Sequence, residues 1–444
     1  MTLPATGRNL ISVNISGRIL AICGLLFVLS QILFSINIQF PRGYDFDEFH
    51  YVPAAKQFLQ FSEPRNMEHP PLGKMIMAAG IAIGGDRPFG WRLMSTIFGS
   101  LTVVGLFLWA LALFRDEGLA LWVALLTMVD QLVYVQARIG MLDTFMMGFL
   151  AFALALFCWA WNPGLSRISL CRRLGGAGVL FALAASCKWF AIVPWLTCWA
   201  LILALFVIRG WHVTFAGSNE DDWYHSTLFQ RITAWEVCVF FGFIPAVVYF
   251  ATFVPYTMMA RSPYHLWDLF QLQSRMFGDQ LRVVNTHPYM SQWTDWAIMK
   301  RPIWYAFDKE GWSNEDVRGV VLLGNPLIMW SGLLALLFCI WGWVQNRSRE
   351  AFLILVFYCC FYFSWALIPR KVSFYYYYYP AGLTLGLALA YFFSQFEKFI
   401  RSGLPRWIFL ICALGLFVYF FPILAALKIP SESFRKWMWL NSWI

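Results

Sequence analysis

The sequence predicts an all-α polytopic membrane protein. Of its 444 residues, 60% are hydrophobic and 13% are charged, whereas an ordinary soluble domain is about half apolar and a quarter charged. The apolar residues form about eleven runs, each near the length of roughly 20 residues that a helix needs to cross a bilayer. The ten cysteines lie in or beside these runs without a CxxC motif, so no disulfide framework is expected. These observations exclude a soluble enzyme.

The predicted spans follow one another along the whole chain. The first run lacks a small-residue cleavage site, so it is a retained span rather than a signal peptide. The run at 174–187 is short for a crossing, and every later loop would change sides if it did not cross. The expected spans are 18–39, 91–114, 119–137, 141–161, 174–187, 190–208, 235–254, 320–343, 351–369, 380–396 and 407–427.

The distribution of charge predicts the topology and the partners. If the N-terminus is cytoplasmic, the short inside loops are basic, as the positive-inside rule expects. The segments 41–90 and 255–319 are then large extracytoplasmic loops of a single transmembrane domain, 1–427, and 428–444 is an extracytoplasmic tail. The net charge of +9 is spread over single residues rather than Lys/Arg tracts. Anionic lipid or a lipid phosphate is therefore a better partner than nucleic acid.

An acidic pair directly after the first span is the leading candidate for catalysis. Asp47 and Glu48 precede Pro53, which fits the first turn of an amphipathic helix that runs to about Phe61. A helix N-terminus favours an ionised carboxylate, which suits a general base that takes a proton from a hydroxyl. The alternative is that the pair only caps the helix. Asp45 and Asp47 also form an Asp-x-Asp pattern, which holds a metal and nucleotide in soluble sugar transferases but is too short to be specific.

Further loop residues are candidates for the same site. Glu68 and His69 precede two prolines, which hold them rigidly near the membrane surface, although a plain re-entrant corner would have the same composition. His287 lies in the second large loop, where such a residue is more often structural. Glu68 and His287 are the candidate metal ligands, but no spacing motif requires a divalent cation.

Charged residues at the ends of spans need an explanation, because a charge near the bilayer centre costs about 2.5 to 3.5 kcal/mol. On the predicted topology they all lie at the face that carries Asp47. Guanidinium and ammonium groups on one face suit a lipid-linked phosphate, and the alternative is snorkelling to the interface. The candidates for the donor phosphate and sugar are Arg92, Arg138, Asp143, Lys188 and Arg370.

Two other features receive structural interpretations. Asp130, within the third span, is expected to be paired or to face a cavity. The tract 374–379 contains five consecutive tyrosines and predicts an aromatic belt at a span boundary, with a role in lining a lipid or acceptor groove as the alternative.

The ordered set of motifs resembles the protein O-mannosyltransferase family, polyprenyl-phosphate-mannose-dependent enzymes of the membrane glycosyltransferase C superfamily. No single motif is specific, but they run in family order over nearly the whole chain. The matching pieces are Asp47-Glu48 with His50-Tyr51, His69-Pro-Pro-Leu-Gly-Lys74, Arg92 in Trp-Arg-Leu-Met, Arg138 to Asp143, Ser186-Cys-Lys-Trp189, His287-Pro-Tyr with Ser291 and Trp293, Arg301-Pro302, Gly324-Asn-Pro326 and 438–444.

The resemblance implies a fold of about eleven spans, two juxtamembrane helices in the first loop and an extracytoplasmic active site. It implies that Asp47 is the catalytic base, with Glu48 beside it, and that Arg138 or Lys188 holds the donor phosphate. In the related lipid A aminoarabinose transferases, the residues that match Asp47, Glu68 and Asp143 also belong to the active site. The 255–319 segment is too short for the trefoil domain of the eukaryotic enzymes, so a bacterial inner-membrane member with a periplasmic site is expected.

The leading functional hypothesis is an inverting transfer of one sugar, mannose, from polyprenyl phosphate to a hydroxyl of Ser or Thr in exported proteins. A lipid phosphate leaves without protonation, so one base and a cationic clamp suffice. The first alternative keeps the donor but transfers to lipid A or another envelope glycolipid. The second, a transporter or flippase, predicts inverted repeats and charges at the midplane, which the sequence does not show.

Overall fold

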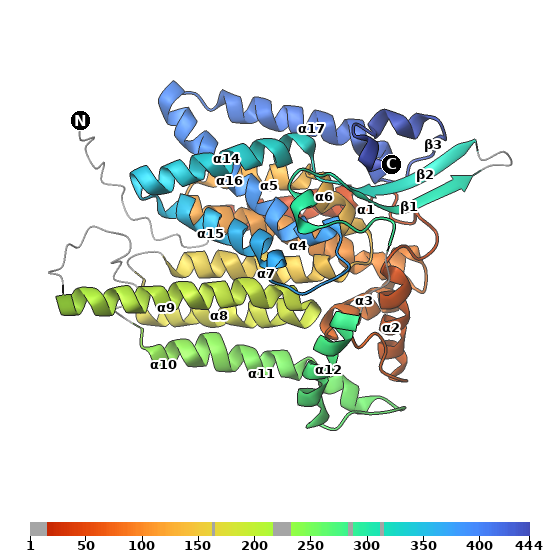
Figure 1. Cartoon of the computed structure of the whole chain (residues 1–444), viewed down its shortest axis with the longest axis horizontal. Coiled ribbons are helices and arrows are strands. Elements are labelled where there is room, and N and C mark those ends of the chain that lie inside the picture. Colours follow the sequence, from red (N-terminus) through yellow and green to blue (C-terminus); the bar gives the residue numbers. More distant parts are fainter. Residues whose placement is uncertain (1–15, 162–164, 216–231, 283–286, 311–314) are drawn as a thin grey trace.

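The fold is a bundle of membrane-spanning helices with a cap of short elements at one end (Figure 1). The computed structural model describes the chain except residues 1–15, 162–164, 216–231, 283–286 and 311–314. Within the described part, nine helical segments are long and apolar enough to cross a membrane, and the bent pair α5–α6 makes a tenth. The protein is an integral membrane protein, as its composition predicts.

The spans form most of the chain. They are α1 (Gly17–Ser35), α4 (Pro88–Phe114), α7 (Leu142–Ala160), α8 (Arg167–Cys187), α9 (Ile192–Phe215), α10 (Ala234–Val237) with α11 (Ile244–Ala251), α14 (Pro326–Asn346), α15 (Arg349–Phe363) and α17 (Leu404–Leu424). The bent pair is α5 (Glu117–Met128) with α6 (Gln131–Arg138). The expected eleventh span corresponds to α16 (Tyr379–Ile400), whose Gly, Thr and Tyr residues make it less apolar than its neighbours.

Capping explains where three helices depart from the predicted boundaries. Helix α8 is not short, because the Ser166 side chain accepts a hydrogen bond from Ser169 N at 3.2 Å and starts the helix before its apolar run. The predicted third span is bent by 61°. There Asp130 caps α6 by accepting from Leu132 N at 3.0 Å. Helix α14 begins at Pro326 rather than 320, since Asn325 caps it and residues 320–322 belong to a strand.

The first loop, 41–90, holds the two juxtamembrane helices that the resemblance implied. They are α2 (Glu48–Gln60) and α3 (Leu72–Gly84). Helix α2 begins five residues before Pro53, so the prediction that Pro53 lies in its first turn was wrong. Figure 1 shows both helices beside α12 at the same end of the bundle.

The second loop and the C-terminal tail form the rest of the cap. The loop contains α12 (Asp268–Arg282), α13 (Trp293–Trp296) and the antiparallel strands β1 (Ile303–Glu310) and β2 (Asp316–Leu322). The tail adds β3 (Ile429–Pro430) to β2, with Val317 opposite Ile429. This small sheet was not predicted. It ties the tail to the loop, because Trp304 Nε1 donates to Trp443 O at 2.9 Å.

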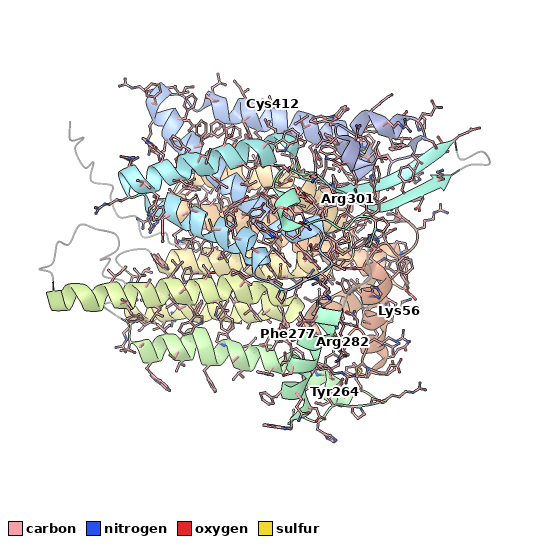
Figure 2. The ribbon with its side chains drawn as sticks, in the orientation of Figure 1. Lys56, Tyr264, Phe277, Arg282, Arg301 and Cys412 are labelled. Carbon is pink, nitrogen blue, oxygen red and sulfur yellow. The ribbon has the colours of Figure 1, made fainter. Side chains whose placement is uncertain are left out.

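The side chains in Figure 2 place Lys56, Tyr264, Phe277 and Arg282 at the capped end and Cys412 on the flank of the bundle. Helix α12 is amphipathic, with Leu269, Leu272 and Met276 buried and Phe270 and Phe277 exposed. All ten cysteines are free, as the absence of a disulfide motif predicted.

Candidate active site

Asp47 lies at the N-terminus of α2, but its side chain does not cap the helix. Its backbone carbonyl accepts from Tyr51 N at 3.0 Å, and its carboxylate oxygen Oδ2 accepts from the Tyr51 hydroxyl at 3.0 Å. Among the described residues, no other hydrogen bond reaches this half-buried carboxylate. The interpretation as a plain helix cap is therefore wrong, and one carboxylate oxygen is left to accept a proton.

Tyr51 is the partner that a sequence search could have found, because residues four apart on a helix lie on one face. Its side chain is fully buried. Burial and the charges of Asp47 and Asp143 hold the pKa of the Tyr51 phenol well above its usual value. The phenol therefore stays protonated and donates to Asp47.

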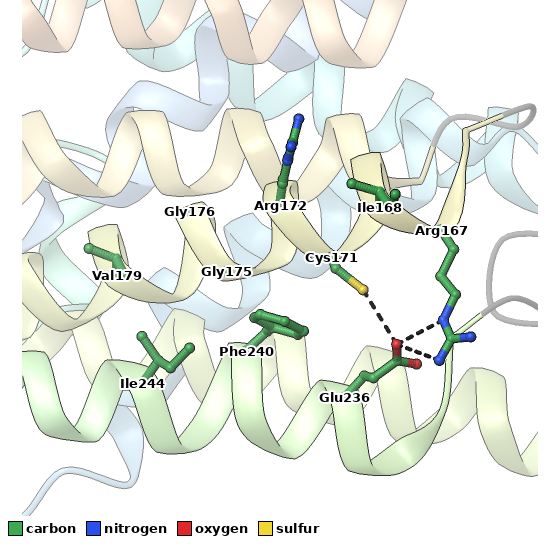
Figure 3. A pocket seen from close by; sticks show the side chains of 10 residues that line it. All are labelled: Arg167, Ile168, Cys171, Arg172, Gly175, Gly176, Val179, Glu236, Phe240 and Ile244. Carbon is green, nitrogen blue, oxygen red and sulfur yellow. Dashed lines mark hydrogen bonds and ion pairs between the residues drawn. The ribbon is translucent and has the colours of Figure 1, made fainter.

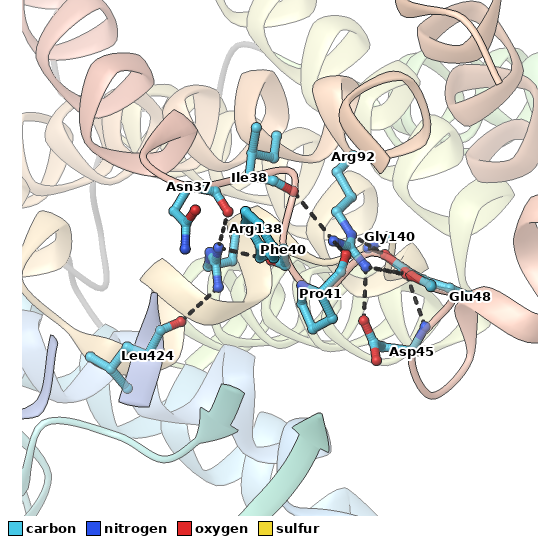
Figure 4. Close-up of polar contacts among 11 residues, drawn as sticks. Asn37, Ile38, Phe40, Pro41, Asp45, Glu48, Arg92, Arg138, Gly140 and Leu424 are labelled. Carbon is cyan, nitrogen blue, oxygen red and sulfur yellow. Dashed lines mark hydrogen bonds and ion pairs between the residues drawn. The ribbon is translucent and has the colours of Figure 1, made fainter. Parts of the chain in front are cut away.

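Glu48, the neighbour of Asp47, lies in a closed network (Figure 4). Its carboxylate oxygens accept from Arg92 Nε at 2.8 Å and Nη2 at 2.7 Å, and from the backbone N–H of Gly140 at 2.7 Å and of Asp45 at 3.0 Å. Both Glu48 and Arg92 have no exposed surface. A buried charge pair with this geometry fixes the start of α2 against α4.

Arg92 has no donor left for a ligand. Besides Glu48, it donates to the carboxylate of Asp45 at 2.8 Å and to the carbonyls of Ile38, Pro41 and Gly43. Asp45, the first residue of the Asp-x-Asp pattern, is thus an ion-pair partner of Arg92.

Arg138 also donates its hydrogen bonds to groups of the protein itself. Its Nη1 donates to Leu424 O at 2.8 Å, and its Nη2 donates to the carbonyls of Asn37 at 2.8 Å and Phe40 at 3.1 Å (Figure 4). Leu424 is the last residue of α17, and Asn37 and Phe40 lie in the segment directly after α1. The fully buried guanidinium therefore joins α6 to the end of α17 and to the segment that follows α1.

Lys188 and Asp143 form a second buried ion pair, with Nζ 2.6 Å from Oδ2. Lys188 ends α8 and Asp143 lies in the first turn of α7, so the pair joins the ends of two spans. The Lys188 ammonium also lies 4.8 Å from the ring centre of Tyr376 and 5.0 Å from that of Tyr377. Such distances allow cation–π attraction.

The five tyrosines are not an aromatic belt. They are buried, mostly in a 3-10 turn, Tyr375–Tyr378, that leads into α16. Arg370 lies 5.0 Å from the ring centre of Tyr377 and donates from Nε to Val372 O at 3.0 Å. The tract therefore brings Lys188 and Arg370, which are far apart in the sequence, to the same aromatic side chain.

His69 lies beside this cluster, with its ring 5.8 Å from that of Tyr51. Its Nδ1 is 3.4 Å from Gln280 Nε2, which also donates to Glu68 O at 2.7 Å. Burial and the positive charges of Lys188, Arg370 and Lys74 hold the pKa of His69 well below its usual value. The ring is therefore neutral at pH 7.

His287 reaches the site from the second loop through aromatic contacts. Its ring lies 5.3 Å from that of Phe46, the residue before Asp47. Phe46 also packs against Tyr305 of β1 at 5.2 Å. Burial raises the pKa of Tyr305 well above its usual value, and the charges of Asp143 and Asp47 raise it further. Sequence reasoning missed Tyr305, because nothing in the chain indicates that β1 returns to the first loop.

Each of the two candidate metal ligands has a hydrogen-bond partner within the protein. Glu68 accepts a hydrogen bond from Asn66 Nδ2 at 3.0 Å, and His287 Nδ1 accepts from Tyr289 N at 3.2 Å. In the part of the chain that the structure describes, no group of three or more His, Cys, Asp or Glu residues is placed to hold a metal ion.

Two family descriptions match this sequence. Residues 68–217 match dolichyl-phosphate-mannose-protein mannosyltransferase, and residues 265–443 match the C-terminal four-TMM region of protein-O-mannosyltransferase. The chain is 26% identical to the polyprenol-phosphate-mannose–protein mannosyltransferase of Mycobacterium tuberculosis, over 90% of this chain and 86% of that protein. The Corynebacterium glutamicum protein of the same name is 24% identical over 90% and 88%.

Solved structures show the same fold. The protein O-mannosyltransferase Pmt1-Pmt2 complex of S. cerevisiae bound to the sugar donor matches with a TM-score of 0.79 and 14% identity, over 97% of this chain and 93% of that chain. ArnT from Cupriavidus metallidurans bound to undecaprenyl phosphate matches with a TM-score of 0.59 and 14% identity, over 92% and 76%.

Proposed function

Because the chain belongs to the protein O-mannosyltransferase family and has the glycosyltransferase C fold, we propose that it transfers one mannose from polyprenyl-phosphate-mannose to a hydroxyl of Ser or Thr in exported proteins. The names of the mycobacterial and corynebacterial relatives support this donor and this acceptor class. The same relatives support a bacterial plasma membrane as the location, with the capped end of the bundle outside the cytoplasm.

The observation that carries the proposal is the Asp47 carboxylate. It is half-buried and accepts one hydrogen bond, from Tyr51. An ionised carboxylate that is held by a single donor can take the proton of an acceptor hydroxyl as that oxygen attacks the anomeric carbon. Attack from the side opposite the phosphate inverts the configuration at that carbon.

The donor phosphate is assigned to Lys188 and Arg370. Both cations lie about 5 Å from the ring centre of Tyr377, and the charge of each lowers the pKa of His69. They therefore lie on the same side of the site. A lipid phosphate leaves as an anion, and fixed positive charge stabilises it as the bond to the sugar breaks. Asp143 orients the Lys188 ammonium by its ion pair.

Glu48, Arg92 and Arg138 are assigned positioning roles rather than contact with the donor. The charged groups of Glu48 and Arg92 are buried and satisfied within the protein, and the buried Arg138 guanidinium donates from Nη1 and Nη2 to backbone carbonyls. Arg92 and Glu48 hold the first loop so that Asp47 faces the site, and Arg138 holds the ends of α1 and α17. His69, Glu68 and His287 line the site, and no step of the proposed reaction uses a metal ion.

A transfer assay with polyprenyl-phosphate-[3H]mannose and a Ser/Thr-rich peptide tests the base. We expect Asp47→Asn to lose transfer by roughly a hundredfold to ten-thousandfold while its donor affinity stays within about threefold of the original, because a general base contributes roughly 10²–10⁴ in rate. Glu63→Gln, which removes a partly exposed carboxylate of the same loop that pairs with Arg65, is the matched control. An active Asp47→Asn enzyme would contradict the assignment.

The acceptor is tested separately. The alternative acceptors are lipid A and other envelope glycolipids. The proposed base and donor site would serve a hydroxyl of either kind of acceptor. The purified enzyme is given labelled donor with either a peptide or an envelope glycolipid. Transfer to the peptide supports the proposal. Transfer to the glycolipid alone would contradict the proposed protein acceptor, but it would not contradict the proposed donor or the role of Asp47 as base.

A further inference from the structure

A groove of about 730 Å³ lies between α8 and α10–α11, at the membrane face opposite the candidate active site. Helix α8 begins at Arg167, which lines the groove, and ends at Cys187, next to Lys188. At 1.5 Å per residue, the two ends of α8 lie roughly 30 Å apart, about the thickness of the hydrocarbon core. The groove is therefore separate from the site already described.

Residues on one face of α8 and one face of α10–α11 line the groove, and the Arg172 side chain points away from Glu236 and Phe240 (Figure 3). Residues three, four, seven and eight apart lie on one face of a helix, and both sets of lining residues follow this spacing. The lining residues are Ile168, Cys171, Arg172, Gly175, Gly176 and Val179 of α8, with Glu236, Phe240 and Ile244 opposite and Arg167 at the start.

The interior of the groove is apolar, and α8 lies close to Phe240 at Gly175. Gly175 brings no side chain to it, and a Cβ there would lie 3.5 Å from the Phe240 ring. Phe240 belongs to a π-helical turn, Cys238–Phe243, and such turns occur frequently at functional sites. The groove is thus shaped for a chain-like apolar group.

The mouth of the groove carries excess positive charge. The Arg167 guanidinium is 2.7 Å from Glu236, so each neutralises the other. Arg172 is exposed and, among the described residues, has no hydrogen bond or ion pair. A cation beside an apolar groove between spans is the chemistry that binds an anionic lipid headgroup, because guanidinium groups bind phosphate oxygens strongly.

We propose that this groove binds one anionic phospholipid of the leaflet opposite the active site. An acyl chain lies along Val179, Phe240 and Ile244, and the headgroup phosphate binds Arg172. Glu236 keeps Arg167 turned aside, so that Arg172 is the cation that selects the headgroup.

Native mass spectrometry of the purified full-length protein tests the site. The protein is titrated with phosphatidylglycerol or phosphatidylcholine that have the same acyl chains. We expect the unmodified protein to retain one phosphatidylglycerol in preference to phosphatidylcholine. Arg172→Gln lowers the affinity for phosphatidylglycerol about tenfold, the loss of roughly one charge-assisted contact. Arg401→Gln, at the end of α16 on the same face, leaves it unchanged.

A second variant tests the groove itself. Val179→Trp fills the space between the two helix faces, so it abolishes the retained lipid whatever its headgroup. Unchanged phosphatidylglycerol binding by Arg172→Gln, or equal retention of the two lipids by the unmodified protein, would overturn the choice of an anionic headgroup. Full binding by a folded Val179→Trp protein would overturn the location.

Discussion

The hydroxyl of Tyr51 donates to the Asp47 carboxylate across one turn of α2, at 3.0 Å. The bond fixes the side chain of the proposed base and leaves its second oxygen free to accept a hydrogen bond. We expect Tyr51→Phe to lower kcat about tenfold, because the carboxylate becomes free to rotate, while the KM for the donor stays unchanged. Steady-state kinetics with the labelled donor check this split. A rise in KM alone would mean that Tyr51 contacts the donor instead.

Glu48 and Arg92 should act as one unit in stability. Removing one partner of a buried ion pair leaves an unpaired buried charge, which costs about 3 to 5 kcal/mol. We expect Glu48→Gln and Arg92→Met each to lower thermal stability in detergent, and the double variant to lose much less than the two single losses together. Additive losses would show that the two side chains do not stabilise each other.

Lys188 and Arg370 should determine donor binding rather than proton transfer. Replacing Lys188 or Arg370 with Gln removes positive charge next to the proposed phosphate position, and we expect the KM for polyprenyl-phosphate-mannose to rise at least tenfold in either variant. Lys371→Gln, which changes the exposed neighbour of Arg370, is the control. A donor KM that stays at the original value in both variants would contradict the assignment.

His69 should make the folded state sensitive to acid. Its pKa is lower in the folded protein than in the unfolded chain, so below about pH 6.5 the unfolded chain binds the proton first. Its contribution to stability is therefore complete above pH 6.5 and falls by about 1.4 kcal/mol per pH unit below it, until the folded-state pKa is reached. We expect His69→Gln to reduce the loss of thermal stability between pH 6.5 and 5.5.

His265→Gln is the matched control for this measurement, since His265 is exposed. It should keep the pH dependence of the unmodified protein. An unchanged pH dependence in His69→Gln would show that the imidazole is protonated as easily in the folded state as in the unfolded one.

Particular residues show how far the sequence alone could go. Runs of apolar residues locate the spans, since the bilayer requires a fixed length of apolar helix. Their ends were less predictable, because Ser166, Asp130 and Asn325 set them through caps that compete with hydropathy. The strand β2 pairs with the tail as well as with β1, and this pairing escaped prediction because more than a hundred residues separate β2 from β3.

The candidate site divides in the same way. By itself, the sequence determined that Asp47, His69, Lys188 and Arg370 are ionisable groups that a membrane protein would not carry without a reason. In the sequence, Arg92 and Arg138 are single charges like the others, and only the tertiary structure showed that their hydrogen bonds go to groups within the protein. The physical reason is that the function of a buried charge depends on its partners. Arg92 is saturated by Glu48 and by backbone carbonyls that folding brings together, whereas one oxygen of the Asp47 carboxylate accepts no hydrogen bond from the described residues.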